Sequence, residues 1–580
     1  MAYLKEDSTF THVIAIDFGT GASGYGIAPK TNSKPSIEVF NPIDENDDQK
    51  TPTAILFDNN QKFIGFGSRA LQKYAEICDD DDTAYLFQTY KMAIHKNQTM
   101  VKSLDNREMP LKKVVSETLR FIADKALEKL KEQLGGIVKK EKIRWVLTVP
   151  ALWNEKDKQF MKEAAVEAKI VNQWNSENLF VCLEPEGASI QCREDADESL
   201  KNKMKKNTIV LVLDNGGGTN DISIQKLTCE PHENFLSEEV LPSSGGCEWG
   251  SKYVDQNFEI FLRNFLGEEI YKNYIQNAIP RLEILKHFEM LKRKFMPGED
   301  ERSRLQLSYL SEYLNNKKLV ELVNKYNQNK SKDEQLKQKG NSCIDLPPKL
   351  MISFFKPLFD KITNKVGELL EETKKKVGYY PKFIFMVGGF SESPFLKNEI
   401  KRLFEKNDIT VLVPKRPQIS VIRGACMYGL NPRLITSRIA KKTYGINTLT
   451  RFNPEKHPEE KKVVIEGEDF CEDVFDIFVK KDQSVGIDEQ WTKIYCPVRT
   501  RQKIMRIIFY CTDETDVEFI DEPGVSKLGE LSIDIGKNTR NIEDKTVKVT
   551  LRFGETSINA TVTNKDSSEE KKCTFNFDFK

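Results

Sequence analysis

The sequence predicts an α/β protein of two similar lobes, followed by a β-rich C-terminal domain. Two observations indicate a duplicated unit. A short apolar run ends at Asp17 and is followed by a glycine turn and a second extended run. The same arrangement returns about 200 residues later, where an apolar run ends at Asp214 before another glycine turn. The third observation is the alternation of apolar and polar residues after about Ser437, which predicts strands.

The chain has 580 residues, too many for one hydrophobic core, so we expect several compact units. We divide it into an N-terminal tail over 1–10, a first lobe over 11–225, a second lobe over 226–430 and a β-rich domain over 431–580. Within the second lobe, residues 317–341 are rich in Lys, Asn and Gln, which suggests a long exposed helix or a flexible insertion, and we expect a flexible insertion at about 300–345.

The composition is that of a globular protein without charge bias. Hydrophobic residues make up 39% of the chain and charged residues 30%, and Lys+Arg equals Asp+Glu at 88 each. Such a balance predicts no global attraction to nucleic acid or to anionic membranes. The sequence contains neither a transmembrane-length apolar run nor a secretory signal pattern, so we expect neither segment. Eleven scattered cysteines favour reduced thiols, and hence a cytoplasmic or nuclear location.

The two glycine turns have the composition of a phosphate clamp. A polyphosphate needs many backbone N–H donors at short range, and glycine lets the main chain approach most closely. Either turn alone could be an ordinary tight turn, but two of them, each after a strand that ends in Asp, indicate a site for the β and γ phosphates. The predicted phosphate-binding residues are Gly19, Thr20, Gly21, Gly216, Gly217, Gly218 and Thr219.

Asp17 and Asp214 close the two strands beside these turns, and we expect them to hold Mg²⁺ through water. Mg²⁺ prefers one or two carboxylates together with waters and phosphate oxygens. Phosphoryl transfer depends on positioning and charge stabilisation more than on covalent help. A water-orienting group and a cation near the γ phosphate would therefore complete the site.

Five segments resemble, in order, the motifs of the heat-shock 70 kDa family of actin-like ATPases. They are residues 14–20, 147–151, 183–188, 213–221 and 385–391. The resemblance covers about residues 11–430 and is closest to the divergent type-12 branch. It implies two lobes of the ribonuclease-H type, and ATP or ADP with Mg²⁺ as ligands.

The resemblance also implies catalytic roles for four residues. Lys91 matches the lysine that contacts the γ phosphate and the attacking water, although an ordinary surface lysine is the alternative. Glu184 matches the acidic residue near the water and the metal. Asp214 and Thr219 match the groups that orient the nucleophile.

A second set of residues matches the adenosine site of the family. Glu289, Lys292 and Arg293 stand three and four residues apart, on one face of a predicted helix. A salt-bridged surface helix is the alternative for this pattern. The matching glycine loop is Gly388, Gly389 and Phe390.

Three departures from the family pattern concern the nucleotide base. Phe390 stands where the family has a small polar residue, Glu392 where it has Arg, and Gln418 where it has Asp. We therefore expect nucleotide affinity or base preference to differ from the family pattern.

The C-terminal part departs further. Residues 434–440 replace the acidic-leucine linker of the family, and no long helix follows them. Residues 444–446 resemble the first strand of the peptide-binding sandwich. We expect a shortened β domain without a helical lid.

Three functions remain open at this point. The first is a weak, stress-related ATPase whose lobe closure gates the β domain in binding unfolded or regulatory client proteins, together with co-chaperones. The second is a nucleotide-sensing scaffold with little turnover, which the altered base loop and the missing lid favour. The third is a small-molecule kinase of the same superfold, although no segment resembles its acidic substrate pocket. The sequence leaves the oligomeric state open.

Overall fold

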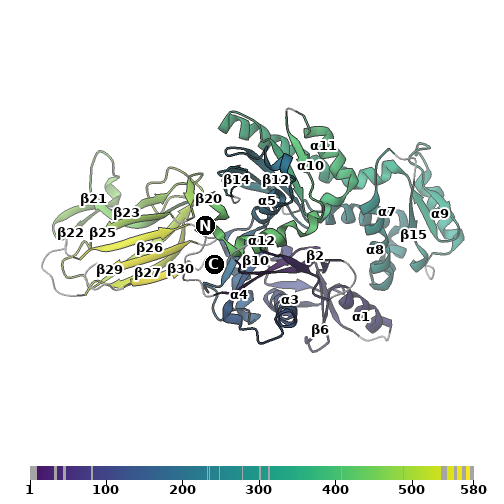
Figure 1. The fold of residues 1–580 in the computed structure, drawn as a ribbon, viewed down its shortest axis with the longest axis horizontal. Helices are drawn as coiled ribbons and strands as arrows, with labels where there is room; N and C mark the ends of the chain where they lie inside the picture. Colours follow the sequence, from purple (N-terminus) through teal and green to yellow (C-terminus); the bar gives the residue numbers. More distant parts are fainter. Residues whose placement is uncertain are drawn as a thin grey trace.

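The computed structural model describes most of the chain between residues 10 and 574. Two α/β lobes lie beside each other, and a β-rich domain extends from one end of them (Figure 1). The residues outside this description include 1–9, which are nine of the ten residues of the predicted tail over 1–10. The described range omits 32–34, 44–47, 80–82, 232, 234–235, 247, 277, 299–301, 311–313, 407, 488, 537–544, 554–557 and 565–569.

The first lobe is built on a mixed sheet with the strand order β11-β10-β1-β2-β3, and β4 pairs with β2. The central strand β1 is apolar and buried along almost its whole length, as expected for a strand covered on both faces. It pairs in parallel with β10 and antiparallel with β2. The strands are β1 His12–Phe18, β2 Ala22–Pro29, β3 Glu38–Phe40, β4 Thr51–Pro52, β10 Ile143–Val149 and β11 Leu179–Leu183.

Helices α3 (Leu111–Leu134) and α4 (Glu155–Glu167) share one hydrophobic core with this sheet. A smaller subdomain of the same lobe carries a three-stranded sheet in the order β6-β5-β7 and a β8-β9 hairpin. Its elements are β5 Ala54–Phe57, β6 Phe63–Phe66, α1 Gly67–Asp79, β7 Tyr85–Gln88, α2 Lys91–His95, β8 Met100–Lys102 and β9 Glu108–Pro110.

The second lobe is built on a seven-stranded sheet with the order β19-β18-β12-β13-β14-β20-β24. Its strands are β12 Ile209–Asn215, β13 Asn220–Leu227, β14 Ser237–Gly246, β18 Phe383–Val387, β19 Thr410–Leu412, β20 Ile435–Ile439 and β24 Ser484–Gly486. Its helices are α7 Lys252–Gln276, α8 Ala278–Lys294, α10 Pro348–Val377 and α11 Pro394–Phe404.

The predicted lobe boundary at residue 225 is wrong. It would cut through β13, which pairs with both β12 and β14. The chain instead passes from the first sheet to the second between β11 and β12, through α5 (Glu184–Asp195) and the short α6 (Glu198–Lys201). The second glycine hairpin therefore belongs wholly to the second lobe.

Helices α5 and α12 (Ser420–Leu430) cross each other between the two sheets. Their contact is so close that a Cβ atom on Gly424 would lie 1.7 Å from the carbonyl oxygen of Gly187. Only glycine permits this approach. The first residue of α5 is Glu184, so this crossing positions a predicted catalytic residue at the junction of the lobes.

The stretch 300–345, which we expected to be a flexible insertion, forms a folded subdomain in its described part. Strands β15 (Ser303–Gln306), β16 (Lys337–Lys339) and β17 (Cys343–Leu346) form a sheet in the order β15-β17-β16, beside α9 (Asn316–Asn327). Its few apolar residues face inward and join the core of the second lobe. Overall polarity misled the prediction, because the spacing of a few apolar residues was enough to build a core.

The C-terminal domain packs two antiparallel sheets around one core. The strand orders are β22-β23-β21-β26-β27 and β25-β28-β29-β30. The strands are β21 Thr443–Arg451, β22 Lys462–Ile465, β23 Glu468–Val479, β25 Gln490–Tyr495, β26 Ile504–Thr512, β27 Ser526–Asp534, β28 Val547–Arg552, β29 Asn559–Asn564 and β30 Glu570–Thr574. In the described residues after Leu430, no α-helix is present.

The predicted start of this domain at residue 431 also needs correction. Strand β20 lies in the sheet of the second lobe, where it pairs in parallel with β14. Strand β24, which follows three strands of the C-terminal domain in the sequence, pairs with the other edge of β20. The two domains therefore share a sheet. Nowhere in the described chain is there a helix long and apolar enough to cross a membrane.

Candidate functional site: a phosphate clamp between two lobes

The first glycine hairpin joins β1 to β2. A Cβ atom on Gly19 would lie 2.2 Å from the carbonyl oxygen of Ala22, so the turn requires glycine there. Two groups of Thr53 hold the loop from behind. Its Oγ1 donates to the carbonyl oxygen of Gly19 at 2.7 Å, and its amide donates to that of Gly21 at 3.0 Å. These two hydrogen bonds fix the carbonyl groups of Gly19 and Gly21, and the backbone amides are the groups of this loop suited to bind an anion.

The second hairpin joins β12 to β13 and is held in the same way. The carbonyl groups of Gly216–Gly218 accept hydrogen bonds of 3.0–3.2 Å from the amides of residues 250–252, at the start of α7. A Cβ atom on Gly250 would lie 2.3 Å from the backbone of Gly217, so this support also depends on glycine. Successive backbone amides oriented by such a loop can form an anion-binding concavity.

The two hairpins touch across the lobes. A Cβ atom on Gly217 would lie 3.1 Å from the amide nitrogen of Gly21, and one on Gly218 would lie 2.7 Å from the side chain of Thr20. The structure therefore brings all the predicted phosphate-binding residues together into one two-sided clamp.

Asp17 ends β1 beside the first hairpin and is buried. Its Oδ1 accepts a hydrogen bond of 2.9 Å from Thr148 Oγ1, and its Oδ2 lies 2.5 Å from Lys50 Nζ. Burial opposes ionisation of this carboxyl, but Lys50 and Lys91 outweigh it and lower its pKa. Neither Thr148 nor Lys50 was predicted, and no local pattern distinguishes this lysine from others.

Lys91 and Glu184 form a buried ion pair of 2.7 Å between the first residues of α2 and α5. The Lys91 side chain is only 2% exposed, so it is not the ordinary surface lysine of the alternative interpretation. Burial raises the pKa of Glu184 to about 7, although Lys91 opposes the shift. A carboxyl that titrates near neutral pH can exchange protons with water under physiological conditions.

Asp214 and Asp221 face each other across the second hairpin, where they are register partners. Burial and then the nearby carboxylates of Glu184 and Asp221 raise the pKa of Asp214. Asp221 was not predicted as a site residue. Its Oδ1 accepts a hydrogen bond from the amide of Leu152 at 3.2 Å, and its buried Oδ2 has no partner among the described residues. The signal that could have found it is its position opposite Asp214 in a hairpin.

Glu289, Lys292 and Arg293 lie together near the end of α8. Lys292 is buried and pairs with Asp255 at 2.7 Å and with Glu289, which also pairs with Arg293 at 2.9 Å. Burial would raise the pKa of Glu289, but the two cations lower it to about 2. These residues form a connected network of ion pairs with a buried lysine at its centre, so they are more than the salt-bridged surface helix of the alternative interpretation. Its contact with adenosine stays a prediction.

Gly388 and Phe390, two residues of the predicted adenosine loop after β18, lie in different surroundings. A Cβ atom on Gly388 would lie 2.4 Å from Asp214 Oδ1, so this glycine lies directly behind the predicted metal carboxylate. The ring of Phe390, in contrast, is buried against Phe355 and Phe359, with centroids 6.4 and 6.2 Å away. The Phe390 ring is therefore part of this core cluster, and its contact with adenosine stays a prediction. An aromatic ring in place of a small polar residue is buried in the nearest apolar cluster.

Glu392 and Gln418 are the other two departures from the family pattern, and both are polar. Burial raises the pKa of Glu392, and Arg293 opposes that shift most strongly among the charges around it. The amide oxygen of Gln418 is buried and has no hydrogen-bond partner in the described structure. Both are polar groups that a nucleotide base could satisfy.

The residues fit a divalent cation by charge but not by direct ligation. Two lysines, Lys50 and Lys91, face four carboxylates, which leaves an excess of two negative charges when all are ionised. Among the described residues, no three His, Cys, Asp or Glu side chains converge to hold a metal ion directly. Asp17 and Asp214 would therefore hold Mg²⁺ through water, with phosphate oxygens as further ligands. The carboxylates are those of Asp17, Glu184, Asp214 and Asp221.

Two glycine hairpins that meet between two α/β lobes, each after a strand that ends in a buried aspartate, define the two-lobed actin-like ATPase class. The model of the Hsp70 protein family matches residues 13–430. The chain belongs to the Hsp70 family.

Similarity to the type-12 members extends over almost the whole chain. Heat shock 70 kDa protein 12A of Mus musculus is 29% identical over 636 aligned positions, which cover 99% of this chain and 92% of that protein. Heat shock 70 kDa protein 12B of Homo sapiens is 29% identical over 641 positions, with the same coverage. Chaperone protein DnaK of Mycoplasmopsis synoviae (strain 53) is 23% identical over 444 positions, which cover 75% of this chain and 62% of DnaK. The resemblance to the type-12 branch is confirmed.

Proposed function

We propose that this protein binds Mg-ATP between its lobes, hydrolyses it slowly, and uses the cycle to control protein binding by its C-terminal domain. The observation that carries the proposal is the buried Lys91–Glu184 pair at the phosphate clamp. A desolvated ion pair rarely contributes net stability, so its position beside two phosphate loops favours a chemical role.

The residues divide the chemical work between them. The two hairpins hold the phosphates by backbone amides, and Thr219 lies in the second hairpin next to Asp221. Glu184, with a pKa of about 7, accepts a hydrogen bond or a proton from the attacking water. Lys91 offsets the charge that develops on the γ phosphate. Mg²⁺, held through water by Asp17 and Asp214, would supply further charge neutralisation when bound.

Two contacts support coupling to the C-terminal domain. Glu186, two residues after Glu184 on α5, accepts a bidentate pair from Arg438 of β20, at 2.7 and 2.9 Å. Lys441 Nζ, just beyond β20, donates to the carbonyl oxygen of Ala151 at 2.6 Å. Ala151 adjoins Leu152, whose amide holds Asp221. A change in lobe angle would therefore act on the segment that joins the domains.

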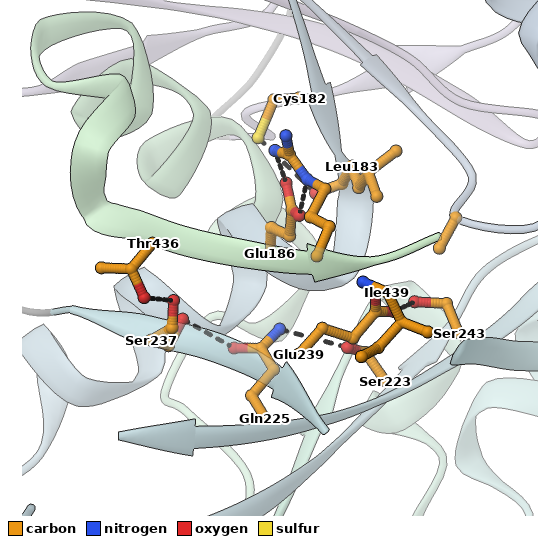
Figure 2. A network of polar contacts seen from close by, with 12 residues as sticks. Cys182, Leu183, Glu186, Ser223, Gln225, Ser237, Glu239, Ser243, Thr436 and Ile439 are labelled. Carbon is orange, nitrogen blue, oxygen red and sulfur yellow. Dashed lines mark hydrogen bonds and ion pairs between the residues drawn. The ribbon is translucent and has the colours of Figure 1, made fainter. Parts of the chain in front are cut away.

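The polar network around β20 extends this connection into the second lobe. Figure 2 shows Thr436 bonded to Ser237, and Ile439 beside Glu239. Thr436 Oγ1 donates to the Ser237 carbonyl at 3.0 Å, and the amide of Ile439 donates to Glu239 Oε2 at 2.9 Å. The proposed output of the cycle is the binding of client proteins, with co-chaperones as regulators, in the cytoplasm or nucleus.

A nucleotide-sensing scaffold with little turnover is the second candidate. It is favoured by Glu392 and Gln418, because they stand where the family has Arg and Asp, and the amide oxygen of Gln418 has no partner among the described residues. Both candidates require ATP binding and differ in the rate of the chemical step.

A small-molecule kinase ranks below them. A cavity of about 690 Å³ adjoins both phosphate loops and could accept a second substrate. Its two carboxylates among the described lining residues are Glu108 and Glu248. Glu108 lies 3.9 Å from Lys102 and Glu248 lies 2.8 Å from Lys96. The hydrogen bond from Lys96 lowers the pKa of Glu248, which makes it a weaker general base.

Single-turnover ATP hydrolysis tests the proposal, with the wild type measured beside Asp17→Asn and Lys91→Ala. We expect slow hydrolysis in the wild type and a loss of about a hundredfold or more in Lys91→Ala, with ATP still bound. Tight ATP binding without hydrolysis in the wild type would leave the scaffold. Release of ADP that depends on an added sugar or polyol would favour the kinase.

A further inference from the structure

Lys50 is held in place by the segment that supports the first phosphate loop. Strand β4, which starts at the next residue, pairs with Ala22 and Ser23 at the beginning of β2. Two residues further on, Thr53 bonds to the loop carbonyls of Gly19 and Gly21. The backbone that carries Lys50 is thus part of the phosphate loop's own hydrogen-bonded frame.

The lysine side chain runs into the cleft over a glycine. A Cβ atom on Gly24 would lie 3.0 Å from Lys50 Cγ and 2.8 Å from the carbonyl oxygen of Gln49. Because Gly24 has no side chain, the aliphatic part of Lys50 can pass close to its backbone. The side chain is only 16% exposed, and its Nζ lies 2.5 Å from Asp17 Oδ2.

The charge of Lys50 acts on both lobes. It lowers the pKa of Asp17 in the first lobe, and it opposes the rise in the pKa of Asp214 and of Glu392 in the second lobe. An ammonium group has three donors, and in the described structure Lys50 uses one on Asp17. The remaining donors lie next to the end of β1, where the phosphate loop begins.

We propose that Lys50 is a phosphate ligand that takes over part of the charge neutralisation otherwise supplied by a divalent cation, so that ATP binds with weak dependence on Mg²⁺. This inference rests on the proposed function, because it concerns the same clamp. Asp17, one of the two predicted metal carboxylates, already has a permanent cation as its partner. Without Lys50 the excess of negative charge at the four carboxylates of the site would be three instead of two, so its positive charge replaces part of what a metal would supply.

Equilibrium binding of ATP by calorimetry, in Mg²⁺ and in EDTA, tests the inference. The wild type should lose no more than about tenfold in affinity when EDTA replaces Mg²⁺. One charge-assisted hydrogen bond corresponds to roughly ten- to a hundredfold in affinity. Lys50→Gln should therefore lose roughly that factor in EDTA and much less in Mg²⁺, and Lys50→Arg should recover most of it.

Lys62→Gln is the matched control, because it removes the charge of an exposed lysine near the same subdomain. It should leave both affinities unchanged. A Lys50→Gln variant with wild-type affinity in EDTA would overturn the inference. So would a wild type that loses more than about a hundredfold without Mg²⁺, and this measurement holds even if the Lys50 variants fail to fold. A wild type that binds no ATP in either condition would instead overturn the proposed function along with it.

Discussion

At the residue scale, the pair that most needs explanation is Lys91 and Glu184. These residues are 93 positions apart in sequence and meet at 2.7 Å with almost no exposure of the lysine. In a buried ion pair, the attraction between the two charges generally offsets only part of the free energy that is lost when both leave water. Burial raises the pKa of the Glu184 carboxyl to about 7, and Lys91 opposes this shift without cancelling it.

Lys91→Met should destabilise the protein more at pH 8 than at pH 6. Burial already raises the pKa of Glu184 above its unfolded value, so its contribution to stability falls as the pH rises through the folded pKa. Removing Lys91 raises that pKa further, and each added unit costs about 1.4 kcal/mol at high pH. Urea unfolding of both proteins at the two pH values measures the difference. Equal destabilisation at both would show that the ion pair has no part in it.

Gly388→Ala should be far more damaging than Gly389→Ala. Gly388 has φ of 80° and ψ of 160°, a conformation nearly restricted to glycine, and a Cβ atom there would lie 2.4 Å from Asp214 Oδ1. A Cβ atom on Gly389 would meet nothing within 4 Å. We expect a loss of about 3 kcal/mol or more for the first and less than about 1 kcal/mol for the second. Thermal unfolding and ATP affinity measure both effects, and similar values for the two variants would contradict the strain argument.

At the element scale, strand β20 is the decisive feature, because it joins the domains as a strand within a sheet. Covered by β14 on one side and β24 on the other, it has no free edge. Its Arg438 reaches back to Glu186 on α5, and the two side chains are only 15% and 7% exposed. The connection between the domains is therefore an integral part of the second lobe.

Arg438→Met should cost about 3–5 kcal/mol, because it leaves Glu186 as an unpaired buried carboxylate. Arg451→Met is the control, since its pair with Glu468 is 82% and 60% exposed and should contribute less than about 1 kcal/mol. Chemical denaturation of the full chain compares the two. Adding Glu186→Met to Arg438→Met should restore part of the loss, and failure to do so would mean that the cost lies in packing alone.

At the scale of the whole molecule, the first lobe also contacts the C-terminal side of the junction through Lys441. Burial, and then the charge of Lys158, lower the pKa of Lys441 to about 8. Its ammonium group nevertheless bonds to the Ala151 carbonyl at 2.6 Å. Lys441 is therefore the group at this junction whose titration we expect in the mildly alkaline range.

The native arrangement should gain stability relative to the unfolded chain as the pH rises from about 8 towards 10. In this window the unfolded chain keeps the Lys441 proton and the folded one releases it, so stability increases with pH. Lys441→Met should lack this increment. Denaturation at pH 7.5 and 9.5 measures the difference in slope between the two proteins. Parallel slopes would show that Lys441 does not titrate in this range.

Local patterns were sufficient for the clamp and for the class of fold. In each glycine hairpin an apolar strand, an aspartate and a glycine turn follow one another within a short run, so its chemistry can be predicted without distant partners. The same applies to the β texture of the C-terminal domain, because strand alternation is a local property.

Other features depend on which segments meet in space, and the sequence does not contain that information in a local form. The position of the Lys50 charge depends on its pair with Asp17, and the burial of Phe390 depends on an aromatic cluster on α10. The lobe boundary was wrong because hydrogen bonds assign β13 to its sheet, and β20 was placed in the wrong domain for the same reason. Sequence motifs thus identify this chain as a two-lobed phosphate binder, whereas long-range pairing sets the charge at its centre and the way its C-terminal domain is attached.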